Sequence, residues 1–149
     1  MKPPFDLIDT PPVWLALCLA LSWALGRIAP MPLPFAGAAG WVLLALGLLF
    51  FAGALAEFAR ARTTVVPRRE PSALITTGVF RLSRNPIYLG DALILAGLSL
   101  LWDAPLALLL VPAFMALVAR RFIAGEEARL KAAFGADYDR WAARTRRWL

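Results

Sequence analysis

The sequence predicts an all-α integral membrane protein with about four transmembrane helices and a C-terminal cytoplasmic or interfacial helical segment. Three observations predict it. Hydrophobic residues make up 60% of the 149 residues. They form long apolar runs rather than the stripes of amphipathic soluble helices, and short charge-dense segments separate these runs. The 16 Lys and Arg residues, against 10 Asp and Glu, lie almost entirely in those segments. We expect one domain over residues 1–149.

The apolar runs predict four helical spans, over residues 13–28, 35–57, 87–102 and 106–118. Only the second has the roughly 20 residues that a bilayer usually requires. The other three must thin the bilayer locally, or use flanking Arg and Trp residues as interfacial anchors. We expect the fourth to continue as a helix into the charged tail.

The basic residues predict the orientation of the spans. Arg27 lies between the first two spans and no basic residue lies between the last two, so the other 15 of the 16 lie in the leader, the segment 59–84 and the tail. The positive-inside rule then places both termini and the middle loop in the cytoplasm. A cleaved signal peptide is the alternative for the first span. Because Asp6 and Asp9 outweigh Lys2, the positive start of such a peptide is missing, and we expect the helix to be retained.

Small residues recur on one face of two spans. Ala36, Gly40 and Gly47 share a face in the second span, and Gly90 and Gly97 do so in the third. Such spacing lets helix backbones approach closely. We expect these residues to pack against a neighbouring helix rather than to line a ligand cleft.

Composition also restricts the chemistry. The chain has no histidine, and its one cysteine, Cys18, lies within an apolar run, which leaves few routes to a hydrolase, a metal site or a thiol enzyme. Nucleic-acid binding is not indicated, because the arginines flank apolar spans and no soluble recognition module accompanies them. The remaining polar residues are gathered in two segments, 72–90 and 120–149, which we expect to be cytoplasmic.

In the first segment Asn85 followed by Pro86 predicts a helix start, with the Asn85 side chain as N-cap. Tyr88 and Asp91, three residues apart, share a face of that helix. Asp91 would lie about one turn inside an apolar span, where a carboxylate is costly. It is therefore either functional or paired with a nearby arginine, Arg81 or Arg84.

In the second segment Glu126 and Glu127 follow the fourth span by about two turns. Spacing alone would pair Glu126 with Arg129 and Glu127 with Lys131 on a solvated face.

The end of the second segment predicts two further helical features. Phe134 and Gly135 indicate a helix end with a glycine C-cap. Asp137 would then begin a last short helix that carries Tyr138 and Trp141. Because basic residues follow, we expect this helix to lie at the membrane interface and face anionic headgroups.

Together the two segments resemble the isoprenylcysteine carboxyl methyltransferase and phospholipid methyltransferase superfamily, over roughly the C-terminal half of the chain. Four motifs, in order and at similar spacing, carry the resemblance: Thr77-Gly78-Val79-Phe80, Arg84-Asn85-Pro86-Ile87-Tyr88-Leu89-Gly90, Glu126-Glu127 and Phe134-Gly135-Ala136-Asp137-Tyr138.

The resemblance implies an enzyme that transfers a methyl group from S-adenosylmethionine to a lipophilic acceptor, either a prenylcysteine-like carboxylate or a lipid amine. It implies an integral protein of a bacterial inner membrane, whose partners are membrane lipids and a lipophilic or lipidated substrate. It also implies a cofactor pocket at the cytoplasmic mouth of the helices, closed by the C-terminal segment. The residues it assigns to the cofactor are Ser72, Ala73, Leu74, Ile75, Phe80, Asn85, Pro86, Ile87, Tyr88, Glu126 and Glu127.

Methyl transfer from a sulfonium needs chiefly proximity and a desolvated nucleophile, and we expect the acceptor to meet the cofactor near Tyr88 and Asp91. An amine acceptor needs a base, for which Asp91 is the best candidate. A carboxylate acceptor needs a positive partner such as Arg121 or Arg84. The carboxyl methyltransferase branch has that arginine where Phe122 stands here, and Arg121 is one residue away. Many relatives have histidine in place of Asn85, so no histidine-dependent step is assumed.

Two alternatives stay open. One is a membrane reductase of the sterol-reductase type, which uses NADPH, although such enzymes are larger. The other is a non-enzymatic packing or regulatory subunit that retains the motifs.

Overall fold

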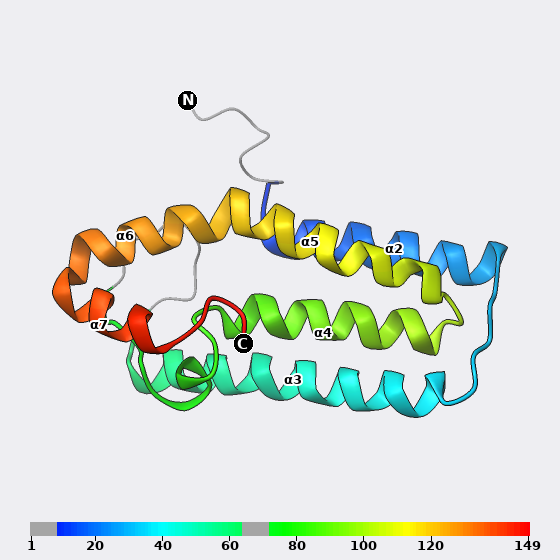
Figure 1. Cartoon of the computed structure of the whole chain (residues 1–149), viewed down its shortest axis with the longest axis horizontal. Helices are drawn as coiled ribbons and strands as arrows, with labels where there is room; N and C mark the ends of the chain where they lie inside the picture. The colour runs from blue at the N-terminus through cyan, green and yellow to red at the C-terminus, as the bar shows by residue number, and fades with distance from the viewer. Residues whose placement is uncertain (1–8, 64–71) are drawn as a thin grey trace.

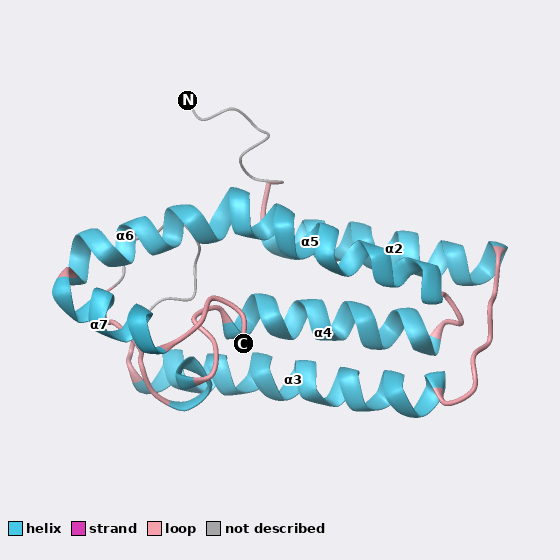
Figure 2. Cartoon of the chain, in the orientation of Figure 1, coloured by secondary structure: helices cyan, strands magenta, loops and turns pink. Residues whose placement is uncertain are grey.

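A computed structural model describes residues 9–63 and 72–149, which form helices joined by short connections, with no strand among them (Figure 2). The helices, in chain order, are α2 (Pro11–Ile28), α3 (Ala36–Arg60), η1 (Gly78–Arg81), α4 (Pro86–Leu101), η2 (Pro105–Leu109), α5 (Leu110–Val118), η3 (Ala119–Ile123), α6 (Ala124–Phe134) and α7 (Ala136–Arg144). The all-helical prediction is confirmed.

Three described helices are long and apolar enough to cross a membrane: α2, α3 and the helix Pro105–Phe134. The last runs from η2 through α6, which confirms that the fourth predicted span continues into the charged tail. The third predicted span corresponds to α4, which is apolar but has only 16 residues. Length and composition therefore support a membrane protein, whereas the count of four spans is not confirmed.

Successive long helices run in opposite directions in one elongated bundle (Figure 1). The connection between α4 and η2 is tight: Asp103 has a φ of 54°, and the amide of Ala104 donates to the carbonyl of Ser99 over 2.9 Å. This reversal makes α4 and α5 antiparallel. Because α6 extends α5 past the start of α4, the two motif segments lie at the same end of the bundle (Figure 1).

Glycines form the contact between α3 and α4. A Cβ atom at Gly47 would lie 2.8 Å from the carbonyl oxygen of Gly90, and one at Gly97 would lie 2.7 Å from that of Gly40. Cβ atoms do not approach neighbours so closely, so the two backbones are in direct contact. These glycines pack helices, as their spacing predicts.

We expect Gly97→Leu to lower the free energy of unfolding by at least about 1–3 kcal/mol, because the new side chain must push α3 away from α4. Gly37→Leu is the matched control. It makes the same substitution in an apolar helix, and a Cβ atom at Gly37 would meet nothing within 4 Å. Melting curves of the two purified variants in detergent test this. A Gly97→Leu protein that melts like wild type would show that the two helices do not pack through this glycine.

The ends of the chain allow a test of orientation. The end of α3 and helix α7 lie at one end of the bundle, with the C-terminal residues beside the start of α4, whereas the connection between α2 and α3 lies at the other end (Figure 1). We expect topology reporters fused after Ala61 and after Leu149 to read cytoplasmic, and a reporter after Pro30 to read the opposite side. A non-cytoplasmic signal from either of the first two would contradict the predicted topology.

Candidate functional site

Tyr88 and Glu126, from the two motif segments, are in direct contact. The Tyr88 hydroxyl donates to Oε1 of Glu126 over 2.8 Å, across 38 residues of sequence. Tyr88 lies in the first turn of α4 and Glu126 in the first turn of α6. The antiparallel hairpin brings these two turns together. Glu126 therefore faces the start of the third predicted span.

Asp91 lies one turn further along α4, on the face that carries Tyr88. Its side chain is buried, and the residue is 6% exposed. Within residues 9–63 and 72–149 it forms no hydrogen bond or ion pair, so the alternative of a structural pair with Arg81 or Arg84 is wrong for the described residues. A buried carboxylate without a partner is costly to fold. Its presence therefore favours a functional role.

Glu127 is bound by arginines rather than by the expected lysine. Arg147 donates to its two carboxylate oxygens, from Nε over 3.1 Å and from Nη2 over 2.6 Å, and Nη2 of Arg84 lies 3.5 Å from Oε1. The hydrogen bond that Arg147 donates to Glu127 raises the pKa of Arg147. Lys131 pairs instead with Asp139, at 3.2 Å. The predicted pair of Glu127 with Lys131 is thus wrong, because the tail folds back to a better donor.

The C-terminal tail is attached to the start of α4 by its backbone as well. Asn85 Nδ2 and Ser83 Oγ both donate to the carbonyl of Arg147, over 3.1 and 3.2 Å, and the Arg84 amide donates to the carbonyl of Arg146 over 2.9 Å. Asn85 and Pro86 begin the helix as predicted. The Asn85 side chain, however, makes no capping hydrogen bond, and that part of the prediction is wrong.

The segment 72–81 packs against α7 and not against Tyr88 and Glu126. Ile75 and Phe80 are buried with Tyr138 and Trp141, and Leu74 and Ile87 lie against the same cluster. Trp141 Nε1 donates to the carbonyl of Phe80 over 3.1 Å. Burial raises the pKa of Tyr138 in this setting. At the start of the segment Ser72 Oγ donates to Oγ1 of Thr63 over 2.7 Å, and Ala73 is half-buried.

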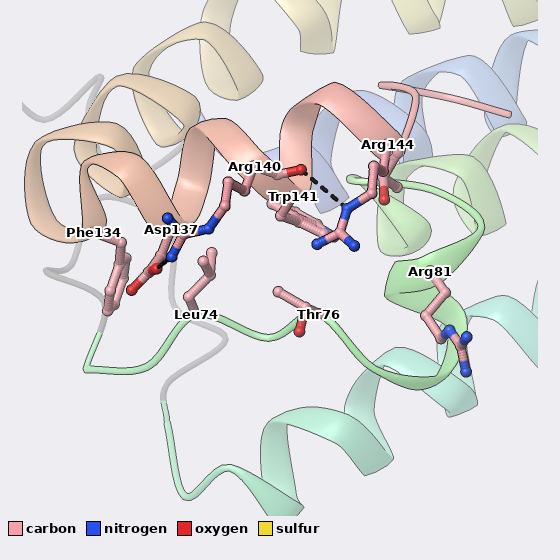
Figure 3. A pocket seen from close by; sticks show the side chains of 9 residues that line it. Leu74, Thr76, Arg81, Phe134, Asp137, Arg140, Trp141 and Arg144 are labelled. Carbon is pink, nitrogen blue, oxygen red and sulfur yellow. Dashed lines mark hydrogen bonds and ion pairs between the residues drawn. The ribbon is translucent and has the colours of Figure 1, made fainter.

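An open pocket of about 640 Å³ lies between this segment and α7 (Figure 3). Its lining residues are Leu74, Thr76, Arg81, Phe134, Asp137, Arg140, Trp141, Arg144 and Thr145. Leu74 is the one residue of the predicted cofactor set among them. Sequence reasoning assigned that whole set to one pocket, but in the structure its residues form two neighbouring groups. Tyr88 and Glu126 belong to one group, and the segment 72–81 packed on α7 forms the other. The C-terminal segment covers both.

Arg121 makes its contacts elsewhere. Its Nη2 lies 3.2 Å from Oδ2 of Asp9, and its guanidinium lies 5.3 Å from the ring centre of Trp14, at the start of α2. The neighbouring Phe122 is buried in the cluster that contains Tyr88. The structure does not bring Arg121 to Tyr88 or Asp91, and its catalytic role stays a prediction.

Glu57 was missed by sequence reasoning. It is 6% exposed at the end of α3, and it accepts a hydrogen bond from Thr77 Oγ1 over 2.5 Å and one from Arg60 over 2.7 Å. Its carboxylate also lies against Gly78, which has a φ of 56°. Glu57 thus holds the turn that leads to Phe80. The sequence could have revealed Glu57, because the helix dipole disfavours a carboxylate in the last turn of a helix, and such a residue needs a partner.

A family model described as phospholipid methyltransferase matches residues 35–137, more than half of the chain. This range contains α3 to α6, both glutamates, and the Tyr88 motif. No curated protein and no solved structure gave a significant match.

Proposed function

The chain belongs to the phospholipid methyltransferase family, and from this premise we propose that it transfers a methyl group from S-adenosylmethionine to a lipid amine at the cytoplasmic face of the membrane. Family membership makes it a membrane methyltransferase. The cofactor, the acceptor and the side of the membrane are our proposal.

The observation that carries the proposal is the contact between Tyr88 and Glu126, with Asp91 one turn further along α4. Tyr88 occupies Oε1 of Glu126, whereas Oε2 has no hydrogen-bond partner among the described residues. A carboxylate held in this way suits the ammonium group or the ribose hydroxyls of the cofactor. The first backbone amides of α4 suit the cofactor's carboxylate, as helix N-termini generally suit anions. The residues present therefore fit the cofactor, which would supply the electrophilic methyl group.

The charges near the site favour an amine over a carboxylate acceptor. Asp91 is a buried negative group without a partner in the described part of the chain. Of the two arginines considered for a carboxylate, Arg121 is paired with Asp9 and Arg84 with Glu127. An incoming ammonium group would be attracted to Asp91, which would take its proton. The freed nitrogen lone pair is then the nucleophile, and the buried surroundings exclude water from it.

Ligand-dependent melting of the purified protein tests the cofactor. We expect S-adenosylhomocysteine at 100 times its dissociation constant to stabilise the protein by about 2.7 kcal/mol, and NADPH to have no effect. Stabilisation by NADPH alone would favour the reductase alternative. No effect of either would favour a non-enzymatic subunit.

Mass spectrometry of reaction products tests the acceptor. We expect a primary-amine phospholipid in mixed micelles to gain methyl groups, and a farnesylcysteine analogue with a free carboxylate to remain unchanged. Methylation of the analogue alone would contradict the role that we propose for Asp91.

A further inference from the structure

We propose that the pocket between the segment 74–81 and α7 binds the phosphate group of an anionic phospholipid headgroup. The pocket is separate from the contact between Tyr88 and Glu126, since neither residue lines it. A lipid bound there would hold the C-terminal segment against the membrane surface, over the proposed site.

Positive charge lines the pocket. Arg81, Arg140 and Arg144 all contribute to its wall, and Asp137 is the one acidic lining residue. Asp137 is already paired with Arg140. In the part of the chain that the structure describes, neither Arg81 nor Arg144 has an ion pair. Two guanidinium groups thus remain available, and guanidinium groups bind phosphate oxygens in bidentate fashion.

Arg144 is oriented by its own helix. Its Nε donates to the carbonyl of Arg140 over 3.3 Å, which leaves both terminal nitrogens for a ligand (Figure 3). Trp141, between these two residues, is fixed by its hydrogen bond to the carbonyl of Phe80. The wall of the pocket on α7 is therefore anchored to the segment opposite.

The apolar part of the lining favours a lipid over a free anion. Leu74, Phe134 and Trp141 supply apolar walls beside the arginines. The volume of about 640 Å³ is far larger than an inorganic phosphate requires. Helix α7, which forms one wall of the pocket, lies at the end of the bundle where the long apolar helices α3 and Pro105–Phe134 reach their polar ends (Figure 1). Anionic headgroups and basic residues meet at that level of a membrane.

The same charges argue against S-adenosylmethionine as the occupant. Its sulfonium and ammonium groups outweigh its one carboxylate, so the molecule is cationic overall, and like charges in a confined site repel one another. Asp137, the carboxylate that would offset this repulsion, is already held by Arg140.

Melting curves in nonionic detergent test the proposal. We expect dioctanoyl-phosphatidylglycerol to raise the melting temperature of the wild-type protein in a saturable manner. Dioctanoyl-phosphatidylcholine and inorganic phosphate should fail to do so at equal concentration. Arg144→Gln and Arg81→Gln should each weaken the apparent affinity for the anionic lipid about fivefold, the value of one interfacial basic residue.

Arg120→Gln is the matched control, because it removes one exposed arginine outside the pocket and should keep wild-type affinity. Unchanged affinity in both pocket variants would overturn the proposal. Equal stabilisation by inorganic phosphate would overturn the lipid assignment. Loss of stabilisation by S-adenosylhomocysteine in the pocket variants, with the lipid response retained, would make the pocket part of the cofactor site. The lipid titration needs neither cofactor nor turnover, so its failure leaves the proposed function standing.

Discussion

Asp91→Asn is expected to reduce turnover by about 100-fold or more, the range for loss of a general base, without unfolding the protein. Asparagine keeps the shape of the side chain but neither attracts an ammonium group nor accepts its proton. Because Asp91 is buried without a partner among the described residues, removal of its charge should leave the melting temperature unchanged or raise it. Steady-state kinetics with a lipid amine, alongside a melting curve, measure both effects.

Asp103→Asn is the control for this substitution. It removes the same charge at the opposite end of the bundle, in a turn whose positive φ asparagine accepts readily. We expect it to keep wild-type turnover. If Asp91→Asn keeps wild-type turnover as well, the carboxylate is neither a base nor an acceptor-orienting group.

Glu126→Gln is expected to weaken S-adenosylmethionine binding by about 1.5–3 kcal/mol, the range for a hydrogen bond to a charged group. This corresponds to roughly 10- to 150-fold in the dissociation constant. The glutamine side-chain oxygen still accepts the hydrogen bond from Tyr88, so the local fold should persist. What is lost is the negative charge opposite the cofactor's ammonium group. Isothermal titration on the purified variant measures the change.

Glu127→Gln separates cofactor binding from attachment of the tail. Glu127 is held by Arg147 and Arg84, so we expect this variant to lose less affinity and more thermal stability than Glu126→Gln. Full affinity in both variants, at the wild-type melting temperature, would remove the two glutamates from the cofactor site.

The bounds of α2, α3 and α4 agree with the predicted spans to within a few residues. Apolar runs, prolines and glycines act locally, so they can be interpreted without knowledge of the fold. The glycine contact of α3 with α4 was predictable for a related reason. A helical period of 3.6 residues places Gly90 and Gly97 on one face, and such a face favours close packing.

The contact of Tyr88 with Glu126 was predictable in part. The resemblance implied that the two segments share a site, and the short connection at residues 103–105 requires an antiparallel hairpin. The resemblance also implied that the C-terminal segment closes this site, but the sequence did not reveal which residues attach that segment. Arg147 is 20 residues from Glu127, whereas Lys131 is a helical neighbour, and spacing rules favour the neighbour.

The sequence by itself determined an all-helical membrane protein, the helix ends, the packing glycines and the family. Tertiary structure decided the partner of each charged group. The tail folded back onto Asn85 and Glu127, and α7 enclosed a basic pocket against a segment about 60 residues earlier. Arg121 lies in the π-helical turn Ala119–Ile123 and pairs with Asp9, which precedes α2. Hydropathy and helical period are local properties, whereas ion pairs form between whichever charges the fold brings together.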